Sequence, residues 1–281
     1  MNVSVIIVNY NSEKVLKNCL ISLLKYSFYL SGVMVVDNNS SDDGVAMVRN
    51  NFSEVKLLIN RENQGFSRAN NLAAGNSHGE LLFFLNPDTL IQEDIFKPVI
   101  EAFKGNNRLA IVAPGLVLPD GSSQPWACGH KGEIFHLIKN KIFSQFPSTQ
   151  APSPRLPDYP IPDYPITQSL TWVSGAALFV RRNVFRDVGG FDEKFFMYFE
   201  DRDFCQRVKK MGYEIEVMPE IKVVHLGGKS LTDNKNRKKL YYQSQSYYWQ
   251  KKYGLFISLF LRLARWPYKL YICFSTTSSD F

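Results

Sequence analysis

Acidic and imidazole side chains stand at the ends of apolar runs at several points of the chain. Asp37, Asp88 and His225 each follow such a run, and the pair Glu200 and Asp201 follows a run of aromatic residues. Short apolar runs are typical of buried parallel strands, and open α/β sheets bind ligands at the carboxyl ends of their strands. Carboxylates and imidazole are ligands of Mg²⁺ and Mn²⁺. Together these residues predict a metal-assisted site for a nucleotide sugar.

Asp37 occupies the position where doubly wound sheets place a carboxylate that recognises a nucleoside. A dinucleotide fold would also need a glycine-rich turn after the first strand, and residues 9–12 contain no glycine. The interpretation as an NAD site therefore loses its main support. The alternative that Asp37 is a turn or capping residue stays open, because residues 38–42 have the composition of a turn.

Asp88 also has a structural interpretation. Asn86 to Thr89 reads as a turn, in which Pro87 fixes φ and Thr89 is able to cap a following helix. In its context, however, a carboxylate after a central strand that faces the turn carrying Asp37 can hold Mg²⁺ or Mn²⁺ against two phosphates.

His225 alone would more often be a structural histidine than a metal ligand. It ends an apolar strand and precedes the glycine-containing stretch 226–230, which is able to fold over a diphosphate. Imidazole suits Mn²⁺ as one ligand among oxygens. A metal role for His225 is therefore predicted together with Asp88.

The acids Glu200 and Asp201 would also be favourable at a helix N-terminus, where the helix dipole stabilises negative charge. The five residues before them are aromatic or apolar, and a carboxylate lodged among such side chains is desolvated and becomes more basic. Deprotonation of an acceptor hydroxyl requires such a base.

The bulk composition of the 281 residues fits one large α/β domain with an appendage, and 45% hydrophobic content excludes general disorder. The four cysteines form no close-spaced pair, which argues against a zinc knuckle or a disulfide framework and fits a reducing cytosol. Because the chain begins with an apparent strand, we expect no signal peptide and no export.

The first half alternates short apolar runs with amphipathic stretches, which predicts a mostly parallel βαβ sheet. The expected strands lie near 3–8, 33–37, 55–59, 81–85 and 110–113, and the expected helices near 13–26, 42–51, 66–76 and 92–104.

The second half begins with an irregular excursion over 116–168, which contains a tandem Pro-Asp-Tyr-Pro-Ile repeat at 157–166. The repeat is either a neutral duplication in a surface loop or a contact to an acceptor. After it we expect one strand over 170–180, whose Gly175 and Ala176 allow close approach to the backbone. The remaining expected elements are helices at 182–188 and 200–211 and strands at 214–218 and 221–224.

Basic charge is concentrated at the end of the chain. Residues 234–271 hold nine Lys and Arg and no acid, whereas the other 24 basic residues face 26 acidic ones. The excess of +7 thus belongs to the tail and indicates an anionic partner.

Seven stretches follow one another in a characteristic order: VIIVNYN at 5–11, VVDNNS at 35–40, NQGFSRANN at 63–71, FLNPD at 84–88, WVSGA at 172–176, FMYFEDRD at 196–203 and HLGGKS at 225–230. Each stretch alone is weak evidence for a protein family. The ordered set covers most of residues 1–230 and is specific for one family. The chain resembles family 2 glycosyltransferases of the GT-A fold, and more narrowly bacterial rhamnosyltransferase-type members that build O-antigen and related polysaccharides.

This resemblance implies a GT-A domain over 1–230, with a nucleotide-sugar-binding half at 1–115, the excursion at 116–168 and an acceptor half at 169–230, followed by a helical tail at 231–281. It implies Asp201 as the base, and Asp88 with His225 as ligands of Mg²⁺ or Mn²⁺. Asn86 replaces the first acid of the family's metal-binding motif, which leaves one fewer anionic ligand. The resemblance also implies which residues surround the ligands. Around the nucleotide sugar these are Val8, Asn9, Tyr10, Asp37, Asn39, Gly65, Arg68, Asn86 and Asp88. Around the acceptor and the sugar they are Trp172, Gly175, Ala176 and Glu200.

The resulting expectation is an inverting, metal-dependent transferase that uses a dTDP- or UDP-linked sugar, with dTDP-L-rhamnose as the best candidate donor, and a glycan or polyprenyl-linked acceptor. A nucleotidyltransferase is the rival enzyme, but it would need a glycine-rich basic loop after the first strand. A nucleic-acid binder is the rival without catalysis, since the tail interleaves tyrosines with lysines. The apolar run 255–261 argues against nucleic acid as a partner.

The same run predicts that the tail lies on the cytoplasmic face of a membrane, because seven apolar-rich residues are too few to span a bilayer. Basic residues attract anionic lipid and aromatic residues favour the interface. The alternative is that helices of the tail pack back on the catalytic body.

Overall fold

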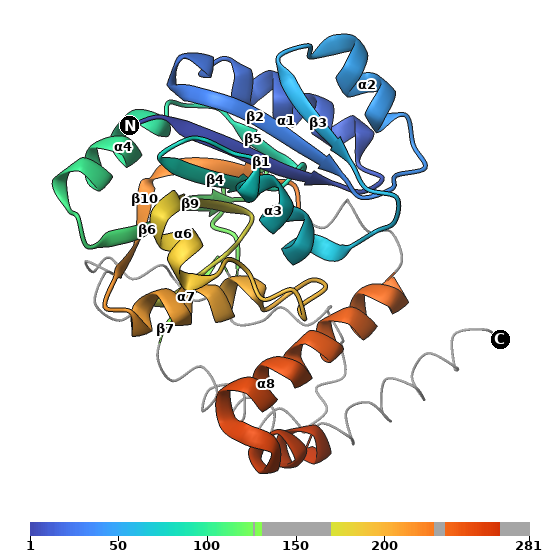
Figure 1. Ribbon diagram of the computed structural model, residues 1–281, viewed down its shortest axis with the longest axis vertical. Coiled ribbons are helices and arrows are strands. Elements are labelled where there is room, and N and C mark those ends of the chain that lie inside the picture. The colour runs from blue at the N-terminus through green and yellow to red at the C-terminus, as the bar shows by residue number, and fades with distance from the viewer. Residues whose placement is uncertain (126, 131–169, 228–233, 265–281) are drawn as a thin grey trace.

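An eight-stranded sheet forms the centre of this computed structural model, which describes residues 1–125, 127–130, 170–227 and 234–264 (Figure 1). The order of its strands is β3 (Val55–Ile59), β2 (Leu30–Asp37), β1 (Val3–Asn9), β4 (Leu81–Leu85), β9 (Ala177–Arg181), β6 (Leu109–Val117), β10 (Glu214–His225) and β5 (Thr89–Ile91).

The sheet is mixed, with more parallel than antiparallel pairs. β1 pairs in parallel with β2 and β4, β2 with β3, and β6 with β10. β9 runs antiparallel between β4 and β6, and β5 runs antiparallel to β10. A small second sheet pairs β7 (Cys128–His130) with β8 (Leu170–Val173). The mostly parallel α/β architecture expected from the sequence is confirmed.

Helices cover both faces of the sheet, and the strands are therefore apolar on both faces. Val3, Val5 and Ile7 of β1 point into a core shared with α1, α2 and α4, while Ile6 and Val8 point into a core shared with α3, α6 and α7. The helices are α1 (Glu13–Leu24), α2 (Gly44–Asn51), α3 (Gly65–Gly75), α4 (Phe96–Gly105), α6 (Arg182–Val188) and α7 (Glu200–Lys210), with a short 3₁₀ turn, η1 (Ser27–Tyr29).

The sheet must curl, because β4 and β5 are close in sequence but far apart in strand order. Four strand spacings of about 4.8 Å would separate them by ~19 Å in a flat sheet, whereas the four residues from Leu85 to Thr89 can reach at most ~14 Å. The curl brings the turn with Asp88 over the carboxyl ends of the central strands, beside the end of β10.

The expected strand over 170–180 is wrong. Residues 174–176 leave the sheet and divide it into β8 and β9, because their backbone groups bond elsewhere. The N–H of Ser174 donates to the carbonyl of Ala127, and the carbonyl of Ala176 accepts from Asn86. The break makes this segment part of the site described below.

Two further boundaries differ from expectation. The predicted strands 214–218 and 221–224 form one strand, β10, whose register shifts between Met218 and Lys222. The helix expected from 92 begins at Phe96, where Asp94 accepts the backbone N–H of Phe96 at 2.9 Å. Thr89 begins β5 and donates to the carbonyl of Asn86 at 2.7 Å, so it caps no helix.

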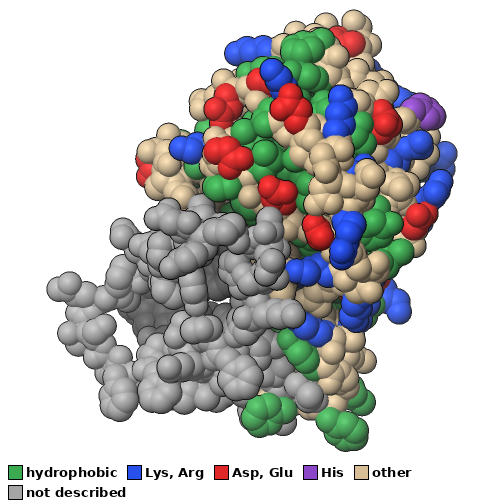
Figure 2. Space-filling view, turned by 90° about the vertical axis from the view of Figure 1, so that its left-hand side faces the viewer, with side chains coloured by type: hydrophobic (Ala, Val, Ile, Leu, Met, Phe, Trp, Pro, Cys, Tyr) green, Lys and Arg blue, Asp and Glu red, His purple; other side chains and the backbone are tan. Residues whose placement is uncertain are grey.

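The tail forms α8 (Asn234–Ala264), which bends at Gly254, where φ is 83° and ψ 173°. Before the bend, Tyr248 is buried against Phe195 and Phe199. The expected alternative, a helix packed back on the catalytic body, therefore holds for this part of α8. After the bend, four apolar side chains are exposed, and apolar side chains are visible at the lower end of the molecule in Figure 2. These four are Leu255, Phe256, Leu259 and Phe260.

No helix within the described residues is both long enough and apolar enough to cross a membrane. The tandem repeat at 157–166 and the loop residues 228–230 lie outside the described residues.

Candidate functional site

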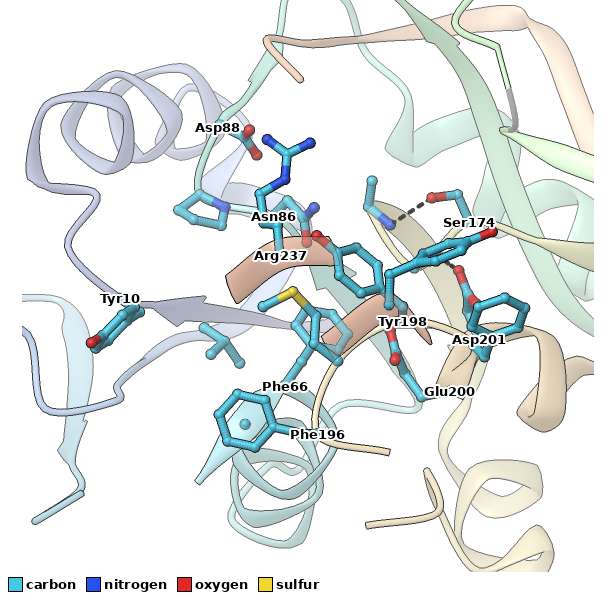
Figure 3. Close-up of a pocket in the computed structure, with 18 of the residues that line it drawn as sticks. Tyr10, Phe66, Asn86, Asp88, Ser174, Phe196, Tyr198, Glu200, Asp201 and Arg237 are labelled. Atoms are coloured by element: carbon cyan, nitrogen blue, oxygen red, sulfur yellow. Dashed lines mark hydrogen bonds between the residues drawn. The ribbon is translucent and has the colours of Figure 1, made fainter. Parts of the chain in front are cut away.

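A cavity of about 400 Å³ opens at the carboxyl ends of the central strands (Figure 3). It brings together most of the residues that the sequence predicted, from segments far apart in the chain. The predicted residues that line it are Val8, Tyr10, Gly65, Asn86, Asp88, Trp172, Gly175, Ala176, Glu200, Asp201 and His225.

Four predicted nucleotide contacts do not line this cavity. Asp37 is 1% exposed and accepts hydrogen bonds from the Asn9 amide at 2.8 Å and from the backbone of Ser40 at 2.9 Å. Asn39 is exposed next to this turn, and Arg68 lies at the surface with 58% of its side chain exposed, 3.8 Å from Glu193.

Asn9 and Asp37 nevertheless lie at the carboxyl ends of β1 and β2, as expected, and Asn38 between Asp37 and Asn39 does line the cavity. The side-chain oxygen of Asn9 is buried and has no hydrogen-bond partner. A buried acceptor without a donor is costly unless a ligand or water supplies one. Nucleoside binding at this turn stays a prediction.

Asp88 and His225 contact each other in the lining of the cavity. The Nε2 atom of His225 lies 3.1 Å from Oδ1 of Asp88, and both side chains are buried. On the other side of the ring, Nδ1 lies 2.8 Å from Oε1 of Gln124. An amide oxygen only accepts, so Nδ1 donates to Gln124. In the neutral ring with its proton on Nδ1, Nε2 would turn a lone pair toward the Asp88 carboxylate, as metal ligation requires.

In that form of the ring, the facing lone pairs of Nε2 and the carboxylate would call for a cation between them. Two ligands bound at right angles and at about 2.1 Å to a divalent ion lie ~3 Å apart, which fits the Asp88–His225 spacing. Gln124 supplies the outer hydrogen bond typical of a metal-bound histidine. No group of three or more His, Cys, Asp or Glu suited to a metal occurs among the described residues. The protein would thus give two ligands, and phosphate oxygens and water the rest.

Asp201 lies across the cavity, at the first turn of α7. Its two carboxylate oxygens accept backbone hydrogen bonds, from Gly175 at 3.1 Å and from Arg202 at 2.7 Å. Burial raises the pKa of Asp201, while the charge of Arg202 and the two backbone bonds act in the opposite direction. This carboxylate is oriented and more basic than a solvated one, as a general base needs.

Glu200 differs from its neighbour. It is 6% exposed, it lines the cavity, and its Oε2 atom has no hydrogen-bond partner. Burial raises its pKa well above the usual range, and the charge of Asp201 raises it further. Burial and their mutual repulsion disfavour two charged carboxylates side by side, so the pair favours a state with one proton.

A strained turn presents both acids. Tyr198 and Phe199 have φ values of 71° and 69°, in the left-handed region that bulky residues seldom adopt. The turn is also tied to α3, because the N–H of Phe66 donates to the carbonyl of Phe196 at 2.6 Å. A Cβ on Gly65 would lie 2.5 Å from that carbonyl, so only glycine fits there.

Gln124, Arg237 and Tyr241 are among the residues that line the cavity but were not predicted from the sequence. Gln124 lies in the stretch interpreted as an irregular excursion, and no local pattern marks it. Arg237 and Tyr241 lie on α8. Basic residues and tyrosines are frequent in this tail, so the sequence pattern does not distinguish these two from their neighbours.

Comparison with known proteins agrees with the family resemblance seen in the sequence. The model of glycosyl transferase family 2 matches residues 4–160, and that of the N-terminal domain of galactosyltransferase matches residues 162–227. The chain is 28% identical over 235 residues to the N-acetylglucosaminyl-diphospho-decaprenol L-rhamnosyltransferase of Mycobacterium tuberculosis, covering 79% of this chain and 75% of that protein. It is 27% identical over 237 residues to the dTDP-rhamnosyl transferase RfbF of Shigella flexneri, covering 82% and 71%.

Solved structures agree in fold. The mannosyltransferase PcManGT from Pyrobaculum calidifontis, in complex with GDP-Man and Mn²⁺, has a TM-score of 0.55 at 17% identity, and the match covers 81% of this chain and 57% of that one. TarS 1-349 of S. aureus in complex with UDP-GlcNAc has a TM-score of 0.57 at 18% identity, covering 82% and 60%. The fold is that of GT-A glycosyltransferases. Because the family model spans more than half of the chain, this protein belongs to glycosyl transferase family 2 and is a glycosyltransferase.

Proposed function

We propose that the protein is an inverting, metal-dependent glycosyltransferase that moves L-rhamnose from dTDP-L-rhamnose to a hydroxyl of a glycan or polyprenyl-linked acceptor during synthesis of a cell-surface polysaccharide. The observation that carries the proposal is one cavity with a basic, backbone-held Asp201 and, among the other residues that line it, the pair Asp88 and His225. The names of the two rhamnosyltransferases above support the donor sugar.

In this proposal the half at 1–115 binds the nucleotide, and the half at 169–230 supplies the base. Asp201 accepts the proton of the acceptor hydroxyl, whose oxygen bonds to the anomeric carbon. The bond from that carbon to the diphosphate oxygen breaks on the opposite face, which inverts the configuration. In this proposal Glu200 is the member of the pair that holds the proton, and it donates a hydrogen bond to a hydroxyl in the cavity.

Asp88 and His225 would hold Mg²⁺ or Mn²⁺, which supplies positive charge beside the leaving diphosphate. The neutral amide of Asn86 lines the cavity and is able to bond to a ribose or sugar hydroxyl.

A panel of dTDP-, UDP- and GDP-linked sugars tests the donor by thermal shift with Mn²⁺ and with EDTA. A ligand that binds only the folded protein raises the melting temperature, and the ranking reports base and sugar together. We expect dTDP-L-rhamnose with Mn²⁺ to give the largest shift. A larger shift with a GDP-linked sugar would contradict the proposed donor. Equal shifts with Mn²⁺ and with EDTA would contradict the proposed metal.

We also propose that the tail attaches the enzyme to the cytoplasmic face of a membrane, where polyprenyl-linked acceptors lie. Phe256 is 88% and Phe260 67% exposed after the bend at Gly254, and they are four residues apart on the helix. Lys252 precedes them, and basic residues near a membrane surface attract anionic lipid. The packed half of α8 would then fix the cavity relative to that surface.

A further inference from the structure

Arg237 reaches the cavity from α8, outside the segments that match the two family models. It lines the same space as Asn86, Asp88 and His225, and in Figure 3 its guanidinium extends toward Asp88. We propose that Arg237 binds the diphosphate of the donor and stabilises the nucleoside diphosphate as it leaves. This inference rests on the proposed function and adds a residue to the same site.

The charges around the cavity support this role. Among the described residues that line it, Arg202 and Arg237 are the permanent cations. The guanidinium carbon of Arg202 lies 3.8 Å from the ring centroid of Trp172, beside Asp201, where the acceptor would bind. Arg237 is the cation on the side of Asp88.

A second cation beside Asp88 would help to balance the charge of the diphosphate, because few protein ligands would hold the metal there. Asn86 brings no charge, so Asp88 is the anionic ligand of the proposed metal site beside His225. As the bond to the sugar breaks, negative charge grows on the diphosphate oxygen. A positive group already oriented toward that oxygen stabilises the transition state more than the ground state.

The position of Arg237 is fixed from two sides. Its side chain hydrogen-bonds to the phenol of Tyr198, on the strained turn before Glu200. α8 itself is held by the buried Tyr248 and by Ser244, whose hydroxyl donates to the carbonyl of Met197 at 2.7 Å. A guanidinium is a planar fork of five N–H donors that matches phosphate geometry, and a bond to a phenol helps to orient it.

Calorimetry with dTDP and dTMP tests the proposal on the full chain, with Mn²⁺ present. Arg237→Ala should weaken dTDP binding by ~10–100-fold, as expected for a charge-assisted hydrogen bond, and should weaken dTMP binding much less. Arg237→Lys keeps the charge and should recover part of the loss. Lys239→Ala is the matched control, because Lys239 is exposed on the same helix and has the same charge.

A second variant separates binding from support of the turn. Tyr198→Phe removes the hydrogen bond to Arg237 but retains the guanidinium, so dTDP affinity should fall far less than in Arg237→Ala. Equal losses for dTDP and dTMP in Arg237→Ala, or an equal loss in Tyr198→Phe, would overturn the proposal in favour of a structural role. Unchanged dTDP affinity would overturn it too, with the proposed function intact. If the parent protein bound neither nucleotide, both would fall.

Discussion

The hydroxyl of Ser244 donates a 2.7 Å hydrogen bond to the carbonyl of Met197, and so joins the tail helix to the turn before Glu200 and Asp201. Met197 directly precedes Tyr198 and Phe199, the two residues in the left-handed conformation. Such strained residues persist only where surrounding contacts hold them. Up to its bend, α8 is therefore part of the framework of the cavity.

We expect Ser244→Ala to lower the free energy of unfolding by about 0.5–1.5 kcal/mol, the usual net contribution of one hydrogen bond. Turnover should fall as well, because the turn before Glu200 loses a restraint. Ser246→Ala is the control, since Ser246 donates to Tyr242 within the same helix. Denaturant unfolding and initial rates measure the two effects. Equal loss of turnover in both variants would remove the link between this bond and the turn.

Asp201→Asn should reduce transfer by ~10²–10⁴-fold, the usual contribution of a general base. Donor affinity should stay nearly unchanged, because the base acts on the acceptor. Glu200→Gln is the matched control, and it should retain most turnover, since an amide resembles the protonated acid. If Asp201→Asn kept near-normal turnover, the base would be Glu200. Asp203 is a weaker candidate, because it pairs with Arg207 and Lys251 and does not line the cavity.

The acidic limb of the pH–rate profile should report the raised pKa of Asp201. Only the ionised carboxylate accepts a proton, so kcat/KM should fall as pH drops through a pKa above the usual range of aspartate. Arg202→Gln removes a charge that lowers this pKa, and the limb should therefore move to higher pH. Arg186→Gln, a change at an exposed and distant arginine, should leave it in place. A shift to lower pH in Arg202→Gln would contradict the assignment.

Metal-dependent binding of dTDP should be lost in Asp88→Ala and reduced less in His225→Ala, because a carboxylate brings charge and a neutral imidazole does not. Gln124→Ala should lower metal affinity by ~10-fold or more, since the ring loses the bond that fixes its tautomer. Calorimetry with Mn²⁺ and with EDTA measures all three. If the parent protein bound dTDP with the same affinity in Mn²⁺ and in EDTA, the metal hypothesis as a whole would be excluded.

The membrane proposal predicts that Phe256→Asp with Phe260→Asp abolishes flotation with anionic vesicles, while the parent protein floats and is released by high salt. Point changes are preferable to removing α8, because its first half lines the cavity. Phe28→Asp is the control, as Phe28 is 73% exposed on η1. Flotation of the double variant, or failure of the parent protein to float, would refute the role of these side chains.

Local pattern predicted the first half of the fold well. A short apolar run such as 81–85 is typical of a strand buried on both faces of a sheet. Because amphipathic helical stretches alternate with such runs, the pattern predicts parallel strands. The same reasoning failed at 170–180, which is mostly apolar. There the break at Gly175 depends on hydrogen bonds to Asp201, Ala127 and Asn86, which belong to distant segments.

The sequence by itself determined the α/β class, the family resemblance and most of the residue types that line the cavity, because periodicity and short motifs are local properties. Only the tertiary structure decided that His225 lies against Asp88. The antiparallel pairing of β10 with β5 sets His225 opposite Thr89, and β5 has three residues and no recognisable pattern of its own. It likewise decided that Arg237 of the tail enters the cavity, because packing of Tyr248 on Phe199 fixes the direction of α8. Contacts between residues far apart in sequence follow from the closure of the fold, which local pattern does not encode.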